Sequence, residues 1–217
     1  MFSFFKKPVA EYNAPLSFSY ENISPKLKSK EYFKIWKNAD MAEGIPVFVL
    51  FDKSLEDMLR ENFYEHKEID IENFFEEKRK EKARPPFLGE EDDVGISDTT
   101  PTSFPVILKE KIVLAKVPVK NPWEIFEKIP FGGFNECPCA NVISAFCKMA
   151  YEKYGAMPFA ISSDTLELYL SRRLTKSEAL EFAEKIYYFC PNVFEDGETI
   201  YEIADGISKS DFCFLWW

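Results

Sequence analysis

The chain is poor in histidine and has no long apolar run. Histidine occurs once in 217 residues, as His66 within the charged stretch FYEHKE. A cysteine or serine nucleophile normally needs a nearby histidine as its base, so the sequence gives little support for catalysis of that kind. No apolar stretch approaches the roughly 20 residues that span a bilayer, so we expect no membrane association.

Basic residues are scarce relative to acidic ones. The chain has 27 Lys and Arg against 37 Asp and Glu, a formal net charge of −10 at pH 7. Binding to a nucleic-acid backbone requires clustered basic side chains that displace counterions, and one locally basic stretch, KRKEKAR, is soon followed by the acidic run EEDD. We therefore expect no nucleic-acid partner. The acidity favours docking onto another protein, and a basic one in particular.

The five cysteines are an odd number, and the N-terminal MFSFFKKPVAEY lacks the apolar core of a secretory signal. This combination indicates reduced thiols, so we expect a cytoplasmic protein. Cys137 and Cys139 are one residue apart, whereas paired zinc ligands are usually separated by about two to four residues. We expect no metal and no cofactor.

Three regions follow one another along the chain. Residues 1–78 are expected to form an N-terminal β-α region, able to pack on the same sheet as the rest, because the apolar run IPVFVLF precedes apolar residues at helical spacing. Residues 79–104 are charged and then rich in Pro, Gly, Ser and Thr, which predicts a linker or a long surface loop. Residues 105–217 are expected to form an α+β domain.

The C-terminal region predicts a ferredoxin-like βαββαβ order with extra short helices. The pattern gives a strand, a long helix, a hairpin around Ser163 and Asp164, a helix opened by a capping box, and a final strand in DFCFLWW. We expect a mixed or antiparallel sheet with helices on its faces. Because FCFLWW is apolar on both faces, we expect IPVFVLF to lie beside it, or a second subunit to cover it.

The stretch PFGGFNECPC, residues 130–139, concentrates two glycines, two prolines and two cysteines. The preferred interpretation is mechanical: Gly132 and Gly133 permit a sharp bend that leads into a helix. Pro138 fits the first helical turn, and Asn135 or Cys137 caps it. In the alternative, the glycine amides hold an anion, and the helix start lowers the pKa of Cys137 enough to make it a nucleophile.

Two-residue alternation in TLELYL places Glu167 and Tyr169 on one face of a strand. A solvated face is the simpler expectation. In the alternative, Glu167 and Tyr169 line a groove with Asn135 and Glu136, where paired carboxylates could do acid–base work or hold a hard cation. The ligand-binding candidates are Gly132, Gly133, Asn135, Glu136, Cys137, Asp164, Glu167 and Cys190.

The terminal Trp216 and Trp217 point to opposite faces of the last strand. One of them is expected in the core. The other needs cover, and because aromatic side chains dominate protein interfaces, both are interface candidates.

Several short motifs resemble a known family. GGFNECP, YGA, DTLE, FCPN and the terminal FLWW occur in the order and spacing typical of the bacterial domain-of-unknown-function family 4253. The resemblance covers roughly residues 130–217 and implies a cytoplasmic bacterial protein without an established activity. The chain departs from the family pattern at Phe134, where the family shows Trp, and at Asn192, where it shows Asp.

The incomplete catalytic set, the surplus of aromatic residues and the acidity together favour a non-catalytic protein-binding module, of an immunity type or a regulatory type. Two alternatives use the loop from Gly132 to Cys139: an enzyme, or a sensor of an anion or small ligand. The sequence leaves the oligomeric state and the identity of the partner open.

Overall fold

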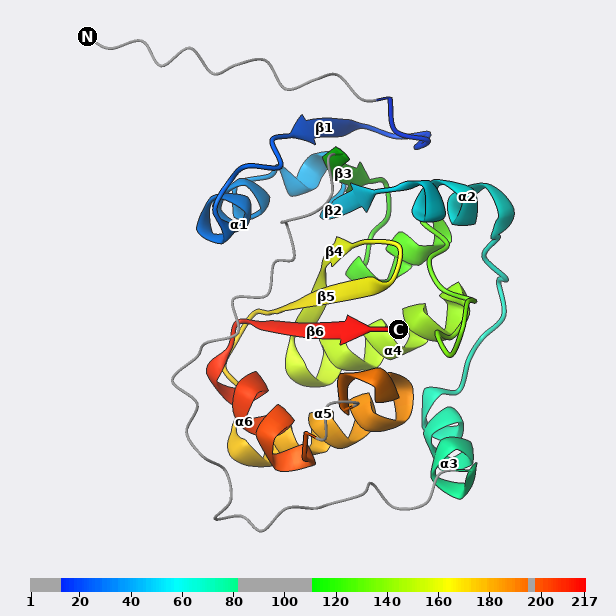
Figure 1. The fold of residues 1–217 in the computed structure, drawn as a ribbon, viewed down its shortest axis with the longest axis vertical. Coiled ribbons are helices and arrows are strands. Elements are labelled where there is room, and N and C mark those ends of the chain that lie inside the picture. The colour runs from blue at the N-terminus through cyan, green and yellow to red at the C-terminus, as the bar shows by residue number, and fades with distance from the viewer. Residues whose placement is uncertain (1–12, 82–110, 195–197) are drawn as a thin grey trace, which may run out of the picture.

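A computed structural model of the protein describes residues 13–81, 111–194 and 198–217. Figure 1 shows the arrangement of its helices and strands. In chain order, the elements are β1 (Tyr20–Ile23), α1 (Ser29–Lys37), η1 (Met41–Glu43), β2 (Ile45–Phe51), α2 (Lys53–Glu61), α3 (Ile71–Glu81), β3 (Lys111–Val117), η3 (Pro122–Glu127), α4 (Ala140–Tyr154), β4 (Ala156–Ile161), β5 (Thr165–Leu170), α5 (Lys176–Phe189), η4 (Pro191–Phe194), α6 (Ile200–Lys209) and β6 (Phe212–Trp216).

The described strands form one mixed sheet in the order β1-β3-β2-β4-β5-β6 (Figure 1). β2 is parallel to β4, and every other pair of neighbours is antiparallel. The expected α+β class with a mixed sheet is therefore confirmed. The C-terminal elements also follow the expected order along the chain. In space, however, β2 separates β3 from β4, so the strands do not interleave as in a split βαβ arrangement.

The position expected for IPVFVLF was wrong. This segment is β2, and it lies between β3 and β4 rather than beside β6. All seven of its residues are buried, which suits a strand covered on both faces. β6 lies at the edge of the described sheet, where Cys213 and Leu215 are buried while Phe214 is half-buried and Trp216 is exposed. The alternation of FCFLW therefore separates a core side from an outer side.

The two faces of the sheet are covered unequally. On the inner face, α4 and α5 pack through residues such as Phe146 and Phe189, whose rings stack with centroids 3.8 Å apart. On the outer face, α1 packs Tyr32 and Trp36 against a smaller cluster that includes Phe48. The side chains of α2, α3 and α6 that enter the core also join the larger, inner cluster.

The end of α3 reaches into the stretch expected to be a linker. Residues 79–81 close this helix, and residues 82–104 lie outside the described residues. The strands β1 and β2, which come from the first 78 residues, hydrogen-bond to β3 in the same sheet as the C-terminal strands. None of the described helices has the length and apolar character needed to cross a bilayer.

Candidate functional site

Residues 130–139, here called the twin-glycine loop, form a bend whose hydrogen bonds are internal. Gly132 and Gly133 have φ values of +101° and +79°. The Gly133 N–H donates to the carbonyl oxygens of Cys137 and Pro138, at 3.2 and 3.0 Å. The side-chain amide of Asn62 donates to the carbonyl oxygens of Pro130 and Gly132, at 3.2 and 2.7 Å. The Gly133 amide is therefore engaged within the loop and is not presented to an anion.

The loop leads into α4, but not with the expected caps. The helix begins at Ala140, and Cys139 occupies the N-cap position without a side-chain cap to the helix. Neither Asn135 nor Cys137 caps it, and Pro138 precedes the cap instead of lying in the first turn. Close packing of the loop against α4 sets the bend: a Cβ added to Gly132 would overlap the Pro138 carbonyl oxygen. Glycine is required at this position for both space and backbone conformation.

The cysteines of the loop differ in exposure. Cys137 is 5% exposed, and burial, with a smaller contribution from Cys190, raises the pKa of its thiol. The alternative in which the helix start lowers the pKa of Cys137 is therefore wrong, since desolvation outweighs the field of the helix start. Cys139 is exposed, and its thiol donates to Oδ1 of Asn141 at 2.7 Å. Within the described ranges, no group of three or more His, Cys, Asp or Glu side chains could hold a metal ion.

Two hollows flank the twin-glycine loop. One, of about 640 Å³, is lined by Asn135 and Glu136 together with residues of α3 and the end of α5. The other, of about 210 Å³, is lined by Gly132, Gly133 and Asn62. Asp164 and Glu167 line neither hollow. The structure thus brings the loop candidates together with each other, and leaves the two carboxylates of the hairpin elsewhere.

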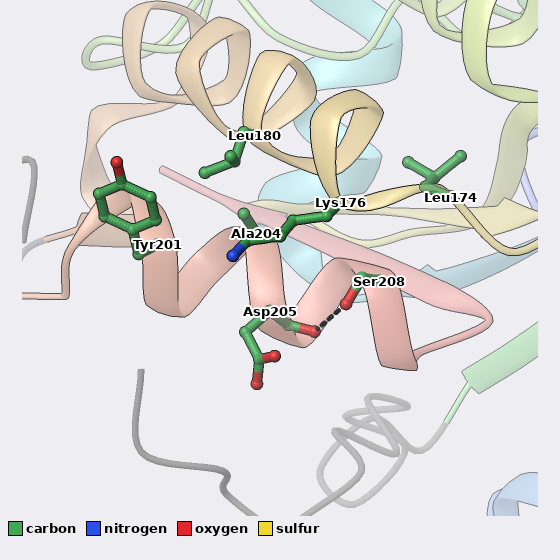
Figure 2. A pocket seen from close by; sticks show the side chains of 7 residues that line it. All are labelled: Leu174, Lys176, Leu180, Tyr201, Ala204, Asp205 and Ser208. Atoms are coloured by element: carbon green, nitrogen blue, oxygen red, sulfur yellow. Dashed lines mark hydrogen bonds between the residues drawn. The ribbon is translucent and has the colours of Figure 1, made fainter. Parts of the chain in front are cut away.

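A third hollow, of about 400 Å³, lies between α5 and α6 (Figure 2). Figure 2 shows that the Tyr201 hydroxyl and the Asp205 carboxylate point away from one another. Asp205 also pairs with Lys209 at 2.6 Å on its own helix, and Ser208 donates to the Asp205 carbonyl oxygen at 2.8 Å. Asp205 and Ser208 therefore make their contacts within α6, and the polar groups that line this hollow do not converge on a common point. The hollow between α5 and α6 is for this reason a weak candidate for a ligand site.

Cys190 and Asp164 both secure β6. The Cys190 thiol donates to the carbonyl oxygen of Trp216 at 2.9 Å and accepts from its N–H at 3.2 Å. Asp164 lies in the turn between β4 and β5, where its carbonyl oxygen accepts from the Trp217 N–H at 3.0 Å. Neither residue shares a groove with Asn135 and Glu136, so the two candidates have structural contacts instead.

Glu167 lies on the outer face of the sheet, opposite the twin-glycine loop. Its neighbours in sequence, Leu166 and Leu168, point into the inner cluster, which also contains Cys137, and Glu167 therefore points the other way. The expectation of a solvated face was wrong, because Glu167 is 1% exposed. Neither of its carboxyl oxygens has a hydrogen-bond partner among the described residues. Burial without a partner raises its pKa well above the ordinary value.

Four aromatic side chains lie on the outer face of β5 and β6, in register with Glu167 or one pair away from it. Glu167 pairs with Phe214 of β6, and the flanking pairs are Tyr169 with Phe212 and Thr165 with Trp216. We call Tyr169, Phe212, Phe214 and Trp216 the aromatic face. Phe33 of α1 packs against the end formed by Tyr169 and Phe212.

At the other end, no ring of another described residue contacts Phe214 or Trp216, and Trp216 is 38% exposed. Trp217 instead lies in the core, against Phe131 and Phe189. The sequence reasoning missed Phe212 and Phe214, although the two-residue alternation that paired Trp216 with its strand face also applies to them.

Comparison with protein families gave one finding. Residues 113–217 match the family model described as "Domain of unknown function (DUF4253)", which confirms the resemblance carried by the C-terminal motifs. No curated protein and no solved structure matches the chain significantly.

Proposed function

Since residues 113–217 belong to the DUF4253 family, whose description states no activity, the geometry of the chain has to indicate its role, and we propose a non-catalytic protein-binding module. It is of an immunity type or a regulatory type and acts in the cytoplasm of a bacterium. Cytoplasmic action agrees with five cysteines that are all in the thiol form. The net charge of −10 favours a basic partner over nucleic acid.

The observation that carries the proposal is the aromatic face with a buried carboxyl group beneath it. Trp216 is 38% exposed at the edge of the sheet, and Phe212 and Phe214 beside it are half-buried. Contiguous exposed aromatic side chains are costly in water and mark interaction surfaces, where Trp is a frequent anchor. Glu167 adds a polar group that the fold itself does not satisfy.

The partner is expected to dock on the face of β6 and not along its edge. The backbone groups of Phe212, Phe214 and Trp216 point away from β5, because the pairs that hydrogen-bond to β5 include Asp211 and Trp217. Cys190 occupies both backbone groups of Trp216, and Ser210 Oγ accepts from the Phe212 N–H at 2.9 Å. Much of the edge is thereby closed to strand addition.

The contacts around the twin-glycine loop favour binding over catalysis. Cys137 is buried with a raised pKa, and Glu167 lies on the opposite face of the sheet. His66 packs against the ring of its neighbour Tyr64, with centroids 5.1 Å apart. Nucleophile, base and acid would have to lie within hydrogen-bond reach of one another, and these side chains lie on different elements and different faces.

Site-specific photo-crosslinking tests the proposal. A benzophenone amino acid is placed at position 216, and a matched control carries it at Phe63, which is 74% exposed beside the twin-glycine loop. In native lysate, position 216 is expected to crosslink to one protein in near-stoichiometric amount, and position 63 is not. No adduct at position 216, or the same adducts from both positions, would refute docking on the aromatic face.

A second function, sensing of a small anion, is favoured by the 640 Å³ hollow. This hollow combines Asn135 of the loop with Lys78 of α3 and the exposed Cys139 at the start of α4. Lys78 already pairs with Glu81 at 2.8 Å, which weakens its pull on an anion. Thermal-shift screening against phosphate and nucleotides separates the two functions, because the protein-binding module is expected to show no stabilisation.

A further inference from the structure

Glu167 is a buried acid for which the described fold supplies no counter-charge. Both carboxyl oxygens are buried, and neither accepts a hydrogen bond from a described residue. Buried polar side chains nearly always have a partner, and those that do not call for an explanation such as a ligand. The hydroxyl group of Thr165, two residues before Glu167 on the same face, is already hydrogen-bonded to Ser162 Oγ at 2.7 Å.

The surroundings of Glu167 suit a cation. In the register of the sheet, its partners are Phe214 on β6 and Ala160 on β4, and Tyr169 follows it on its own face of β5. Aromatic rings attract a cation placed over them, and a carboxylate provides the full opposite charge. Ala160 is small, and on the side of β6 the nearest side chain in register with Glu167 is the ring of Phe214.

A cation held between a carboxylate and an aromatic ring already occurs elsewhere in this protein, between α5 and α3. The side chain of Lys185 is 5% exposed, and its Nζ lies 3.0 Å from Oε2 of Glu72. The same Nζ lies 4.5 Å from the centroid of the Phe75 ring. A buried ammonium group between a carboxylate and an aromatic ring is therefore compatible with this core. Glu167 and its register partner Phe214 provide the carboxyl group and the ring of a similar arrangement, without a cation from the described residues.

Resting on the proposed function, we propose that Glu167 receives the positively charged side chain of an arginine or lysine of the partner protein, inserted between Phe214 and Trp216. Phe214 and Trp216 are partly exposed, so in this proposal the side chains of these two residues rotate to admit the cation. A second copy of this chain is a poor occupant, since two chains of charge −10 repel one another.

A pair of small probes tests the chemistry directly. N-acetyl-arginine amide carries the guanidinium group, and N-acetyl-citrulline amide is its neutral counterpart of nearly the same shape. The indole N–H signal of Trp216, identified with Trp216→Phe, is followed by NMR during titration. We expect a saturable shift with the arginine probe and none with the citrulline probe. Equal responses to the two probes, or no response to either, would overturn the proposal.

Variants locate the cation. Glu167→Gln keeps the shape of the side chain and is expected to weaken the response to the arginine probe by about tenfold or more, because a charged hydrogen bond is lost. Glu136→Gln, which removes an exposed acid of the twin-glycine loop, should leave the response unchanged. An unchanged response in Glu167→Gln also overturns the proposal, and the comparison of probes on the unmodified chain does not depend on any variant folding.

The two proposals fail separately. If position 216 crosslinks to a protein and the arginine probe has no effect, the docking surface stands and the basic anchor is wrong. If the arginine probe binds through Glu167 and position 216 captures no protein, the cation site stands without a protein partner.

Discussion

In the twin-glycine loop, the N–H of Gly133 and the amide of Asn62 each reach two carbonyl oxygens, whereas on the aromatic face neither oxygen of Glu167 has a donor among the described residues. Both regions break simple rules of protein structure. The loop uses positive φ values, and the aromatic face buries an acid. The difference is that the loop's departures are compensated by contacts within the fold.

We infer from this difference that the twin-glycine loop has a structural role and that the aromatic face has a binding role. A bend that is hydrogen-bonded to its surroundings leads into α4, whose Ile143 and Phe146 are fully buried. A buried carboxyl group without a partner among the described residues lowers stability, so a bound group explains it better than the fold does. The five predictions below are ordered from the largest effect to the smallest.

Gly132→Ala should disrupt the loop most. The added Cβ would overlap the Pro138 carbonyl oxygen and the end of the Ile143 side chain, at a φ of +101°. We expect a loss of about 3 to 5 kcal/mol in the free energy of unfolding, measured by urea denaturation. Gly133→Ala is the control, because its Cβ meets nothing closer than Asn62 at 3.9 Å, and it should cost about 1 to 2 kcal/mol. Similar losses in both variants would mean that packing does not set the bend.

Glu167→Met should raise the free energy of unfolding, whereas Gly132→Ala lowers it. Replacing an unpartnered buried carboxyl group with an apolar side chain of similar length removes its desolvation cost. We expect a gain of about 2 kcal/mol in the free energy of unfolding at neutral pH. Denaturation of the purified variant beside the parent chain measures it. A loss of stability would show that Glu167 has a structural role, and the contrast with the loop would disappear.

The pH dependence of stability should identify Glu167 as the acid concerned. Burial raises its pKa above the ordinary value of 4.5, so above pH 4.5 the unfolded chain loses a proton that the folded chain keeps. Stability is then highest below pH 4.5 and falls as pH rises toward the folded-state pKa, by at most about 1.4 kcal/mol per pH unit. Denaturation between pH 4 and 8 measures this fall, and Glu167→Gln should abolish it.

Glu178 provides a control of opposite sign. The hydrogen bond from Arg172, at 2.7 Å, lowers the pKa of Glu178 to about 2, with help from Thr175. Its contribution to stability is present above pH 4.5 and is lost as pH falls toward 2. Denaturation of Glu178→Gln is therefore followed from pH 5 down to about pH 2. If Glu167→Gln and Glu178→Gln changed the pH profile in the same direction, the assignment of an unpartnered acid to the aromatic face would be wrong.

Cys190→Ala should loosen the edge of β6. It removes the thiol that bonds both backbone groups of Trp216, at a cost of about 1 to 2 kcal/mol. The uncapped edge should also increase self-association in sedimentation velocity, because an open edge pairs with other strands. Cys190→Ser keeps a donor and an acceptor and should show less of both effects. Equal behaviour of the two variants would argue against edge capping.

The smallest expected effect is a difference in the rate of thiol labelling between Cys139 and the other cysteines. Cys139 is exposed, whereas Cys137, Cys147, Cys190 and Cys213 are buried. Iodoacetamide should therefore modify Cys139 in the folded chain and the other four only after unfolding, as read by mass spectrometry. Labelling of Cys137 as fast as Cys139 would mean that the loop opens in solution.

The hairpin at Ser163 and Asp164, the capping box at Thr175 and the alternation in β6 could all be predicted, since each depends on residues close in sequence. The place of β2 could not, because β2 and β4 pair across more than a hundred residues of chain. The caps of α4 were misplaced for a related reason. The loop's path depends on Asn62, which lies far away in sequence.

The sequence by itself determined the kinds of elements, the two-residue alternation that puts Glu167 with Tyr169 and Trp216 apart from Trp217, and the acidity of the chain. The tertiary structure alone decided that Glu167 is buried and without a donor, that Cys137 is inaccessible, and that Cys190 holds the edge of β6. The physical reason is that alternation assigns a side chain to a face of its strand, while burial and hydrogen bonding depend on which distant segments pack against that face.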